Sequence, residues 1–238
     1  MNKNKKKNNS LVVGFDADDT LWENENIFYE TQIKFKNILK NYADFSEKEF
    51  IKIEKENLNY YGYGVKGFIL SLIEASIKIS DKKIEADIIE KFLNLGKKML
   101  NHPLKVLPNV EDILKQLSEQ YFLLLITKGD LFDQEKKIYK SNLAHYFDHI
   151  EIVSEKNNSS YKKILRKYDI DPKKFLMVGN SIKSDIIPVN NIGGKAIYIP
   201  FSHTWEHEIT DTEYISDDYV QLDDISLIIP FIKKLLKT

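Results

Sequence analysis

Short apolar segments alternate with helical periodicity over the second half of the chain, and this alternation limits the possible folds more than any other feature. Apolar runs typical of buried strands lie at 122–127, 149–154, 175–180 and 195–200, with a shorter candidate at 219–220. Helical spacing of apolar residues occurs between these runs, at 110–117, 133–141, 161–168 and 184–190. Such alternation predicts an α/β fold with a parallel sheet that helices cover on both faces.

A long helical segment separates the first candidate strand, 11–15, from the others. Apolar residues recur at helical spacing from about 24 to 100, and Ser46-Glu47-Lys48-Glu49 is a capping-box pattern that opens one helix. Glycines punctuate 60–67, which predicts a turn between helices. We therefore expect three parts: a basic tail at 1–10, a core built from 11–22 and 103–238, and a helical insert at 23–102.

The charge balance argues against partners that bind through a strong electrostatic field. The chain has 238 residues, with 35 basic and 36 acidic side chains and a net charge of −1. We expect neither nucleic acid nor membrane as a partner, although the tail MNKNKKKNNS could also be interpreted as a nucleic-acid-binding arm. The absence of cysteine excludes disulfides and thiolate chemistry, and it is compatible with a cytoplasmic location.

Polar residues follow four of the predicted strands. In open α/β sheets, ligands bind beyond the carboxyl ends of the strands, where these residues would meet. Carboxylates that are crowded together need a cation or protons, and sites rich in oxygen suit Mg²⁺. A phosphoryl group would need donors, such as hydroxyl, amide and ammonium groups. The residues at these positions are Asp16, Asp18, Asp19, Thr20, Thr127, Lys128, Gly129, Lys156, Asn180 and Asp185.

Each of these residues taken alone also has an ordinary structural interpretation. Asp16 and Asp18 could form a chance pair of solvated acids, and Thr127 or Asp185 could cap a helix. Lys156 could be a surface lysine. Only the ordered set of four motifs, each directly after a predicted strand, indicates a phosphoryl-transfer site.

The four motifs together resemble those of the haloacid dehalogenase superfamily. The matching segments are DADDT (16–20), LLLIT (123–127), Lys156 before a helix, and VGNSIKSD (178–185). The resemblance extends from about residue 11. The segments DADDTLW, YGYGVKGF, VGNSIKSD and FSHTWEHE resemble those of a bacterial subgroup of phosphatases within this superfamily. This resemblance implies a Rossmann-like, doubly wound parallel sheet, with the segment 23–102 as an inserted all-helical cap of the first type.

The resemblance also implies a role for each motif residue. Asp16 would be the nucleophile and Asp18 the general acid and base. Thr127, Lys128, Gly129 and Lys156 would bind the phosphoryl group. Mg²⁺ would be held by Asp16, Asp18 (through its carbonyl) and Asp185.

Two positions refine this assignment. Asn180 stands where many relatives have an acid, so it would orient a metal-bound water without adding charge. The presence of Asp18 favours phosphoryl transfer over dehalogenation, because a halide leaves without a proton. Asp19 receives no chemical role.

Two further segments, 60–67 and 202–208, each have a functional and a structural interpretation. In the turn at 60–67, Tyr61, Tyr63 and Lys66 would contact the substrate and determine specificity; otherwise the turn is an ordinary helix connection. The segment SHTWEHE (202–208) suggests zinc, but it lacks a helical HExxH pattern, and packing beside the active-site edge is preferred.

The sequence therefore predicts a Mg²⁺-dependent phosphatase that acts on a small phosphorylated metabolite through an aspartyl-phosphate, as a monomer or homodimer. A phosphoglucomutase-like phosphotransferase would use the same residues. A non-catalytic module that binds phosphoproteins is the alternative from another class, and it would not need both a nucleophile and an acid.

Overall fold

The computed structural model describes residues 11–42, 47–201 and 219–237. These residues form two compact units. Of the described residues, the sheet unit takes those within 11–23, 104–128 and 135–237, and the helical unit takes those within 24–103 and 129–134. The short segment 129–134 thus groups with the helical unit, although the sequence analysis assigned it to the core.

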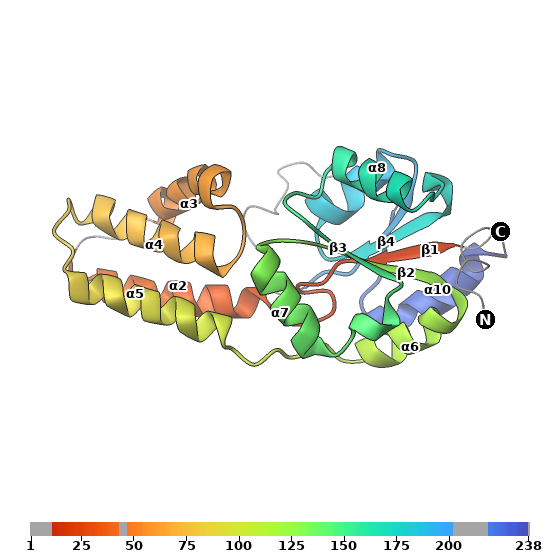
Figure 1. The fold of residues 1–238 in the computed structure, drawn as a ribbon, viewed down its shortest axis with the longest axis horizontal. Coiled ribbons are helices and arrows are strands. Elements are labelled where there is room, and N and C mark those ends of the chain that lie inside the picture. The colour runs from red at the N-terminus through yellow and green to blue at the C-terminus, as the bar shows by residue number, and fades with distance from the viewer. Residues whose placement is uncertain (1–10, 43–46, 202–218, 238) are drawn as a thin grey trace. The chain divides into compact units, whose positions relative to one another are not determined.

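The sheet unit is built on parallel strands, as the alternation predicted. The described strands form one sheet in the order β3-β2-β1-β4-β5-β6, and every neighbouring pair is parallel (Figure 1). Their bounds are β1 Val12–Phe15, β2 Phe122–Lys128, β3 His149–Val153, β4 Phe175–Gly179, β5 Lys195–Tyr198 and β6 Tyr219–Gln221. The strand order reverses beside β1, which places β1 and β4 at the centre of the carboxyl edge.

Helices cover both faces of this sheet. The helices with residues in the sheet unit are α6 Val110–Gln120, α7 Leu131–Ser141, α8 Asn158–Lys167, α9 Ile187–Asn190 and α10 Ile228–Leu235. Val13 and Leu123 face the side of α6 and α10, whereas Val12 and Leu124 face the side of α8 and α9. Successive strand residues point to opposite faces, so strands buried on both sides must be apolar throughout.

Two helix starts differ from the expected positions for local reasons. The side chain of Asn157 accepts hydrogen bonds from the backbone amides of Ser159 and Ser160 at 2.9 and 3.0 Å, so α8 begins at Asn158 instead of 161. A proline inside a helix normally kinks or divides it, and the last helix contains Pro230. Because α10 begins at Ile228, Pro230 lies in its first turn, where a backbone N–H has no partner within the helix.

The described part of the sheet unit also contains short turns of other types. The 3-10 turns are Ala144–Tyr146, Pro172–Lys174 and Ile225–Leu227. A single π-helical turn, Ile182–Ile186, follows β4 and replaces the first part of the predicted helix at 184–190. Such turns occur frequently at functional sites.

The helical unit is built around aromatic side chains. Its helices are α2 Glu25–Leu39, α3 Glu47–Tyr61, α4 Val65–Ile79 and α5 Ala86–Leu100 (Figure 1). The ring of Phe35 lies 4.9 Å from that of Phe92 and 5.9 Å from that of Phe50, measured between centroids. The buried face of each helix meets the others in this cluster, so the unit has a hydrophobic core of its own.

The turn between α3 and α4 is shorter than the predicted 60–67. Only residues 62–64 lie outside the two helices. Gly62 and Gly64 have φ of 67° and 94°, a region that glycine adopts without steric cost, so three residues are enough to connect the helices. Ser46, the first residue of the predicted capping box, lies outside the described residues.

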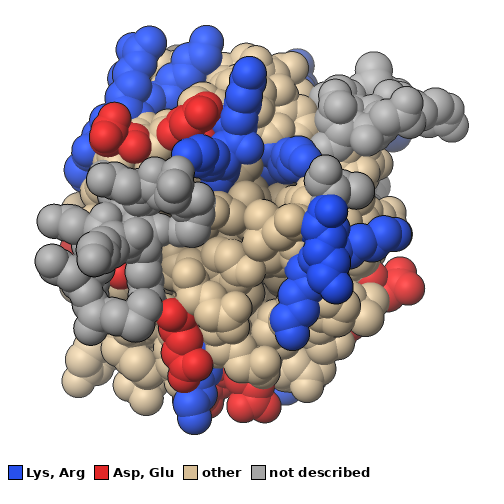
Figure 2. All heavy atoms as spheres, turned by 90° about the vertical axis from the view of Figure 1, so that its right-hand side faces the viewer, with Lys and Arg blue, Asp and Glu red and all other residues tan. Residues whose placement is uncertain are grey.

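Two observations bear on membrane and nucleic-acid partners: the character of the described helices, and the charge on the one face that Figure 2 shows. None of the described helices combines the length and the apolar character needed to cross a membrane. Both basic and acidic side chains appear on the face shown in Figure 2, with uncharged surface between them.

Candidate active site

The chain turns sharply after β1 and brings Asp16 to the carboxyl edge of the sheet. The Asp16 amide donates to the carbonyl of Val178 at 2.9 Å, which continues the pairing of β1 with β4 by one residue. The Leu21 amide then donates to the carbonyl of Ala17 at 2.8 Å, and Asp19 has a φ of 62°. Asp19 is therefore a buried turn residue in a conformation that aspartate tolerates better than most residues.

Lys156 joins the first and fourth motifs. It follows β3, and its ammonium donates to Oδ1 of Asp16 and, at 2.7 Å, to Oδ1 of Asp185. All three residues are buried, with Lys156 only 4% exposed. Residues separated by up to 169 positions in the chain thus meet in one charged cluster, at the edge where the sequence analysis expected it.

The electrostatics of this cluster are unbalanced. Burial raises the pKa of Asp16 to about 7, the negative charge of Asp185 adds to this increase, and Lys156 opposes it. Burial acts to lower the pKa of Lys156, but the carboxylates of Asp16 and Asp185 outweigh it and raise that pKa. One ammonium therefore faces two carboxylates, which leaves an excess negative charge for a proton or a cation to neutralise.

Close packing holds Asp185 in this position. The Ser181 amide donates to Asp185 Oδ2 at 3.1 Å. The buried hydroxyl of Tyr161 donates to the carbonyl of Ser184 at 3.1 Å and lies 3.4 Å from Asp185 Oδ1. The π-helical turn that carries Asp185 thus contacts both the end of β4 and α8.

Asn180 lies against the first motif. We assign its amide with the nitrogen toward that motif, because the opposite orientation places the oxygen against acceptors only. The nitrogen then donates to Asp16 Oδ2 at 3.1 Å and to the Asp18 carbonyl at 3.2 Å. Asn180 therefore contacts the predicted metal ligands themselves, and its effect on a metal-bound water stays a prediction.

The Asp18 carboxylate is held by two donors that the sequence analysis did not identify. Trp22 Nε1 donates to Asp18 Oδ1 at 2.6 Å. Lys137 Nζ, from α7, lies 2.8 and 2.7 Å from Oδ1 and Oδ2. Lysines occur at 136, 137 and 140 of this helix, and no sequence pattern distinguishes the one that reaches the site.

The second motif lies beside the first. Phe15 pairs with Leu125, so Thr127, the residue before the last of β2, lies close to the position of Asp16, where it is buried. Lys128 extends toward the fourth motif, and its Nζ donates to Ser184 Oγ at 3.0 Å. The ammonium of Lys128 therefore lies next to the fourth motif, at the edge of the sheet unit that carries Asp185.

The remaining predicted residues belong to the helical unit. Gly129 follows directly after Lys128 with a φ of 149°. Tyr61 donates to Glu74 at 3.3 Å, and Lys66 pairs with Asp130 at 2.8 Å. The role of Tyr61, Tyr63 and Lys66 in substrate choice stays a prediction, and the segment 202–208 lies outside the described residues.

The residues present fit Mg²⁺, although side chains alone do not complete its ligand set. In the described part of the chain, no three His, Cys, Asp or Glu side chains form a metal-binding group. Magnesium, however, commonly takes one or two carboxylates and keeps several waters. Asp16 and Asp185 supply two carboxylates around one ammonium, and the Asp18 carbonyl lies next to Asp16 through Asn180.

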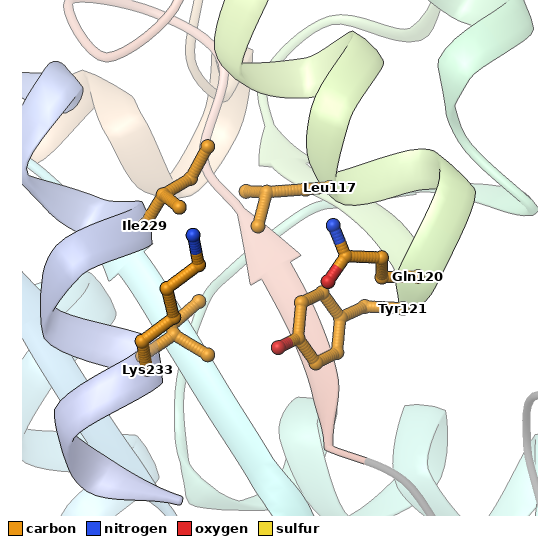
Figure 3. Close-up of a pocket in the computed structure, with 6 residues that line it drawn as sticks. Leu117, Gln120, Tyr121, Ile229 and Lys233 are labelled. Atoms are coloured by element: carbon orange, nitrogen blue, oxygen red, sulfur yellow. The ribbon is translucent and has the colours of Figure 1, made fainter.

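A small pocket in the sheet unit lies away from this cluster. It is lined by residues of α6 and α10 and by Tyr121, which directly precedes β2 (Figure 3): Leu117, Gln120, Tyr121, Ile229, Ile232 and Lys233. The start of β2 is the opposite edge of the sheet from the four motifs, and the lining carries no carboxylate. The pocket therefore takes no part in the candidate active site.

Comparison with known proteins agrees with the geometry. A family model described as haloacid dehalogenase-like hydrolase matches residues 11–193. A haloacid dehalogenase-like family hydrolase from Xanthomonas campestris has the same fold, with a TM-score of 0.86 and 36% identity over 95% of this chain and 91% of that one.

Two curated relatives are named for an activity. Glyceraldehyde 3-phosphate phosphatase from Pyrococcus furiosus is 25% identical over 227 residues, which cover 88% of this chain and 88% of that enzyme. The enzyme of the same name from Methanothermobacter thermautotrophicus is 26% identical over 228 residues, 90% of this chain and 96% of that one. With the family model covering most of its length, the chain belongs to the haloacid dehalogenase-like hydrolases.

Proposed function

We propose that this hydrolase is a Mg²⁺-dependent phosphatase that removes the phosphoryl group from a small metabolite through an aspartyl-phosphate. The observation that carries the proposal is the buried arrangement of Asp16 and Asp185 around the single ammonium of Lys156. Its excess negative charge suits a site that binds Mg²⁺ and then a phosphate ester.

In the first step, a carboxylate oxygen of Asp16 attacks phosphorus, and the bond from phosphorus to the ester oxygen breaks. The leaving alkoxide takes a proton from the carboxyl group of Asp18, which must carry this proton when the ester binds. Lys156 neutralises charge on Asp16 and on the phosphoryl oxygens, and the Thr127 hydroxyl donates to those oxygens. Bound Mg²⁺, held by Asp16, the Asp18 carbonyl and Asp185, would supply further positive charge to the phosphoryl group.

In the second step, water attacks the phosphorus of the aspartyl-phosphate. Asp18 accepts a proton from this water, and the bond between phosphorus and the Asp16 oxygen breaks. Inorganic phosphate leaves, and both aspartates return to their initial state. The step needs no reactant other than water.

The names of the curated relatives indicate the substrate class. Three are glyceraldehyde 3-phosphate phosphatases at 25–26% identity, which supports a small phosphorylated metabolite as the substrate. At this identity the names do not extend to one particular ester, so the test requires a panel. The cytoplasmic location and the monomeric or homodimeric state that the sequence predicted are part of this proposal.

The test is hydrolysis of p-nitrophenyl phosphate and of a panel of phosphate esters, glyceraldehyde 3-phosphate included, with Mg²⁺ and with EDTA. We expect turnover only with Mg²⁺, and at least about a 10³-fold loss in Asp16→Asn, which removes the nucleophile. Asp19→Asn is the matched control, because asparagine also tolerates the backbone conformation of Asp19.

Three results would change the conclusion. Absence of turnover on the whole panel would favour the binding module. Phosphoryl transfer to a sugar phosphate in place of water would favour the mutase. Equal losses in Asp16→Asn and Asp19→Asn would remove Asp16 from the chemistry.

A further inference from the structure

Lys137 makes a contact that neither the four motifs nor the proposed chemistry uses. Its Nζ lies 2.8 and 2.7 Å from the two carboxylate oxygens of Asp18, so it pairs with both at once. The two side chains are mostly buried, with exposed fractions of 16% and 22%. An ion pair that is partly withdrawn from water and held in one geometry restricts both side chains more than an exposed pair does.

Trp22 also holds the Asp18 carboxylate. The indole ring is fully buried, and its Nε1 donates to Asp18 Oδ1 at 2.6 Å. The backbone of Trp22 forms bridges with Asp18 and with Val106. The ring is therefore a rigid anchor, whereas the lysine approaches from a separate element, α7.

We infer that Lys137 is a positioning residue that, together with Trp22, holds the Asp18 carboxyl group where it exchanges a proton with the leaving group and with water. This inference rests on the proposed phosphatase function. An aspartate has two side-chain torsions, and a general acid must lie within hydrogen-bond reach of the oxygen that it protonates. Two donors from different elements remove that freedom before the substrate binds.

The inference predicts that the loss of activity on replacing Lys137 depends on the leaving group of the ester. p-Nitrophenolate departs without a proton, whereas an alkoxide needs one. The ratio kcat/KM covers the steps up to departure of the alcohol. Loss of Lys137 should therefore lower kcat/KM more for an alkyl phosphate than for p-nitrophenyl phosphate.

The experiment compares Lys137→Met, Lys137→Arg and the wild type on p-nitrophenyl phosphate and on the alkyl ester that the wild type hydrolyses fastest. We expect Lys137→Met to lower kcat/KM about 10- to 100-fold on the alkyl ester and less than about 3-fold on the aryl ester. Lys137→Arg should restore most of the alkyl activity. Lys140→Met, at an exposed lysine of the same helix, should change neither value.

Folding is checked by circular dichroism and thermal unfolding, and Lys137→Gln replaces Lys137→Met if the latter does not fold. Equal losses on the two esters, or no loss, would overturn the role of Lys137 and leave the proposed function intact. A wild-type protein that hydrolyses neither ester would overturn the proposed function itself, and this inference with it.

Discussion

Gly179 and Asp185 lie closer together than any residue with a side chain at position 179 would allow. A Cβ atom added at Gly179 would lie 2.2 Å from Oδ2 of Asp185. The glycine ends β4, and the aspartate lies in the π-helical turn that follows. The absence of a side chain at 179 is therefore what lets Asp185 reach Lys156.

We expect Gly179→Ala to displace Asp185. The clash should lower the free energy of unfolding by about 1–3 kcal/mol and lower the activity far more than this loss of stability explains. Thermal unfolding and initial rates measure the two effects. In the control Gly193→Ala, the residue has a φ of 90° and open space around it, so we expect a loss of about 1 kcal/mol with unchanged activity. Unchanged activity in Gly179→Ala would contradict the prediction.

The raised pKa of Asp16 predicts how the stability of the metal-free protein depends on pH. Between pH 4 and pH 7 the folded protein retains a proton that the unfolded chain has lost, because burial raises the pKa of Asp16 from 3.8 to about 7. The contribution of this group to stability therefore falls as the pH rises through that window, by at most about 4 kcal/mol.

Asp16→Asn has no such titration. In EDTA, the melting temperature of the variant minus that of the wild type should increase from pH 5 to pH 7.5, measured by scanning calorimetry. A difference that stays constant with pH would contradict the assignment to Asp16.

Asn180→Asp should strengthen metal binding. The new carboxylate would lie near Asp16 Oδ2 and the Asp18 carbonyl, where the amide nitrogen now lies within 3.2 Å of both. We expect the half-saturating Mg²⁺ concentration to fall about 10-fold, because added ligand charge increases affinity. The metal-free variant should unfold at a lower temperature, since the cluster gains a negative charge. Unchanged Mg²⁺ dependence and turnover would remove Asn180 from the surroundings of the metal.

Tyr161→Phe tests the support of Asp185 from α8. Loss of the buried hydroxyl, which donates to the Ser184 carbonyl at 3.1 Å, should cost about 1–2 kcal/mol of stability. We also expect Mg²⁺ affinity, measured by calorimetric titration, to fall about 10-fold. Tyr139→Phe is the control, because Tyr139 is 87% exposed and should tolerate the same change. Equal Mg²⁺ affinity in both variants would contradict the proposed support.

Lys66→Ala tests the sequence-based prediction that the turn of the helical unit selects the substrate. We expect KM to rise about 3- to 10-fold for some esters of a panel but not for others, with Mg²⁺ dependence unchanged. Lys78→Ala is closely matched: both lysines are on α4, are 53% and 51% exposed, and form ion pairs of 2.8 and 2.7 Å. Identical kinetics of the two variants across the panel would refute the prediction, and Tyr63→Ala extends the test to the same turn.

The parallel sheet and the identity of the motif residues follow from local properties of the sequence. An apolar run such as 122–127 forms a strand in which each residue is buried on one face of the sheet or the other. Polar residues therefore follow such a run where the strand leaves the core. This rule located Asp16, Thr127, Lys156 and Asp185 at one edge without any knowledge of distances. The predicted helix limits were less accurate. Capping by Asn157, for example, starts α8 three residues before the predicted position 161.

The tertiary structure alone decided which groups touch. Lys137 and Asp18 are 119 positions apart, and a lysine on an amphipathic helix looks the same in sequence whether it faces solvent or a carboxylate. The shared ammonium of Lys156, the contact of Gly179 with Asp185 and the orientation of Trp22 likewise depend on how strands and helices pack. Sequence periodicity determines which face of an element is buried, whereas the pairing of polar groups depends on distances that arise only when the elements come together.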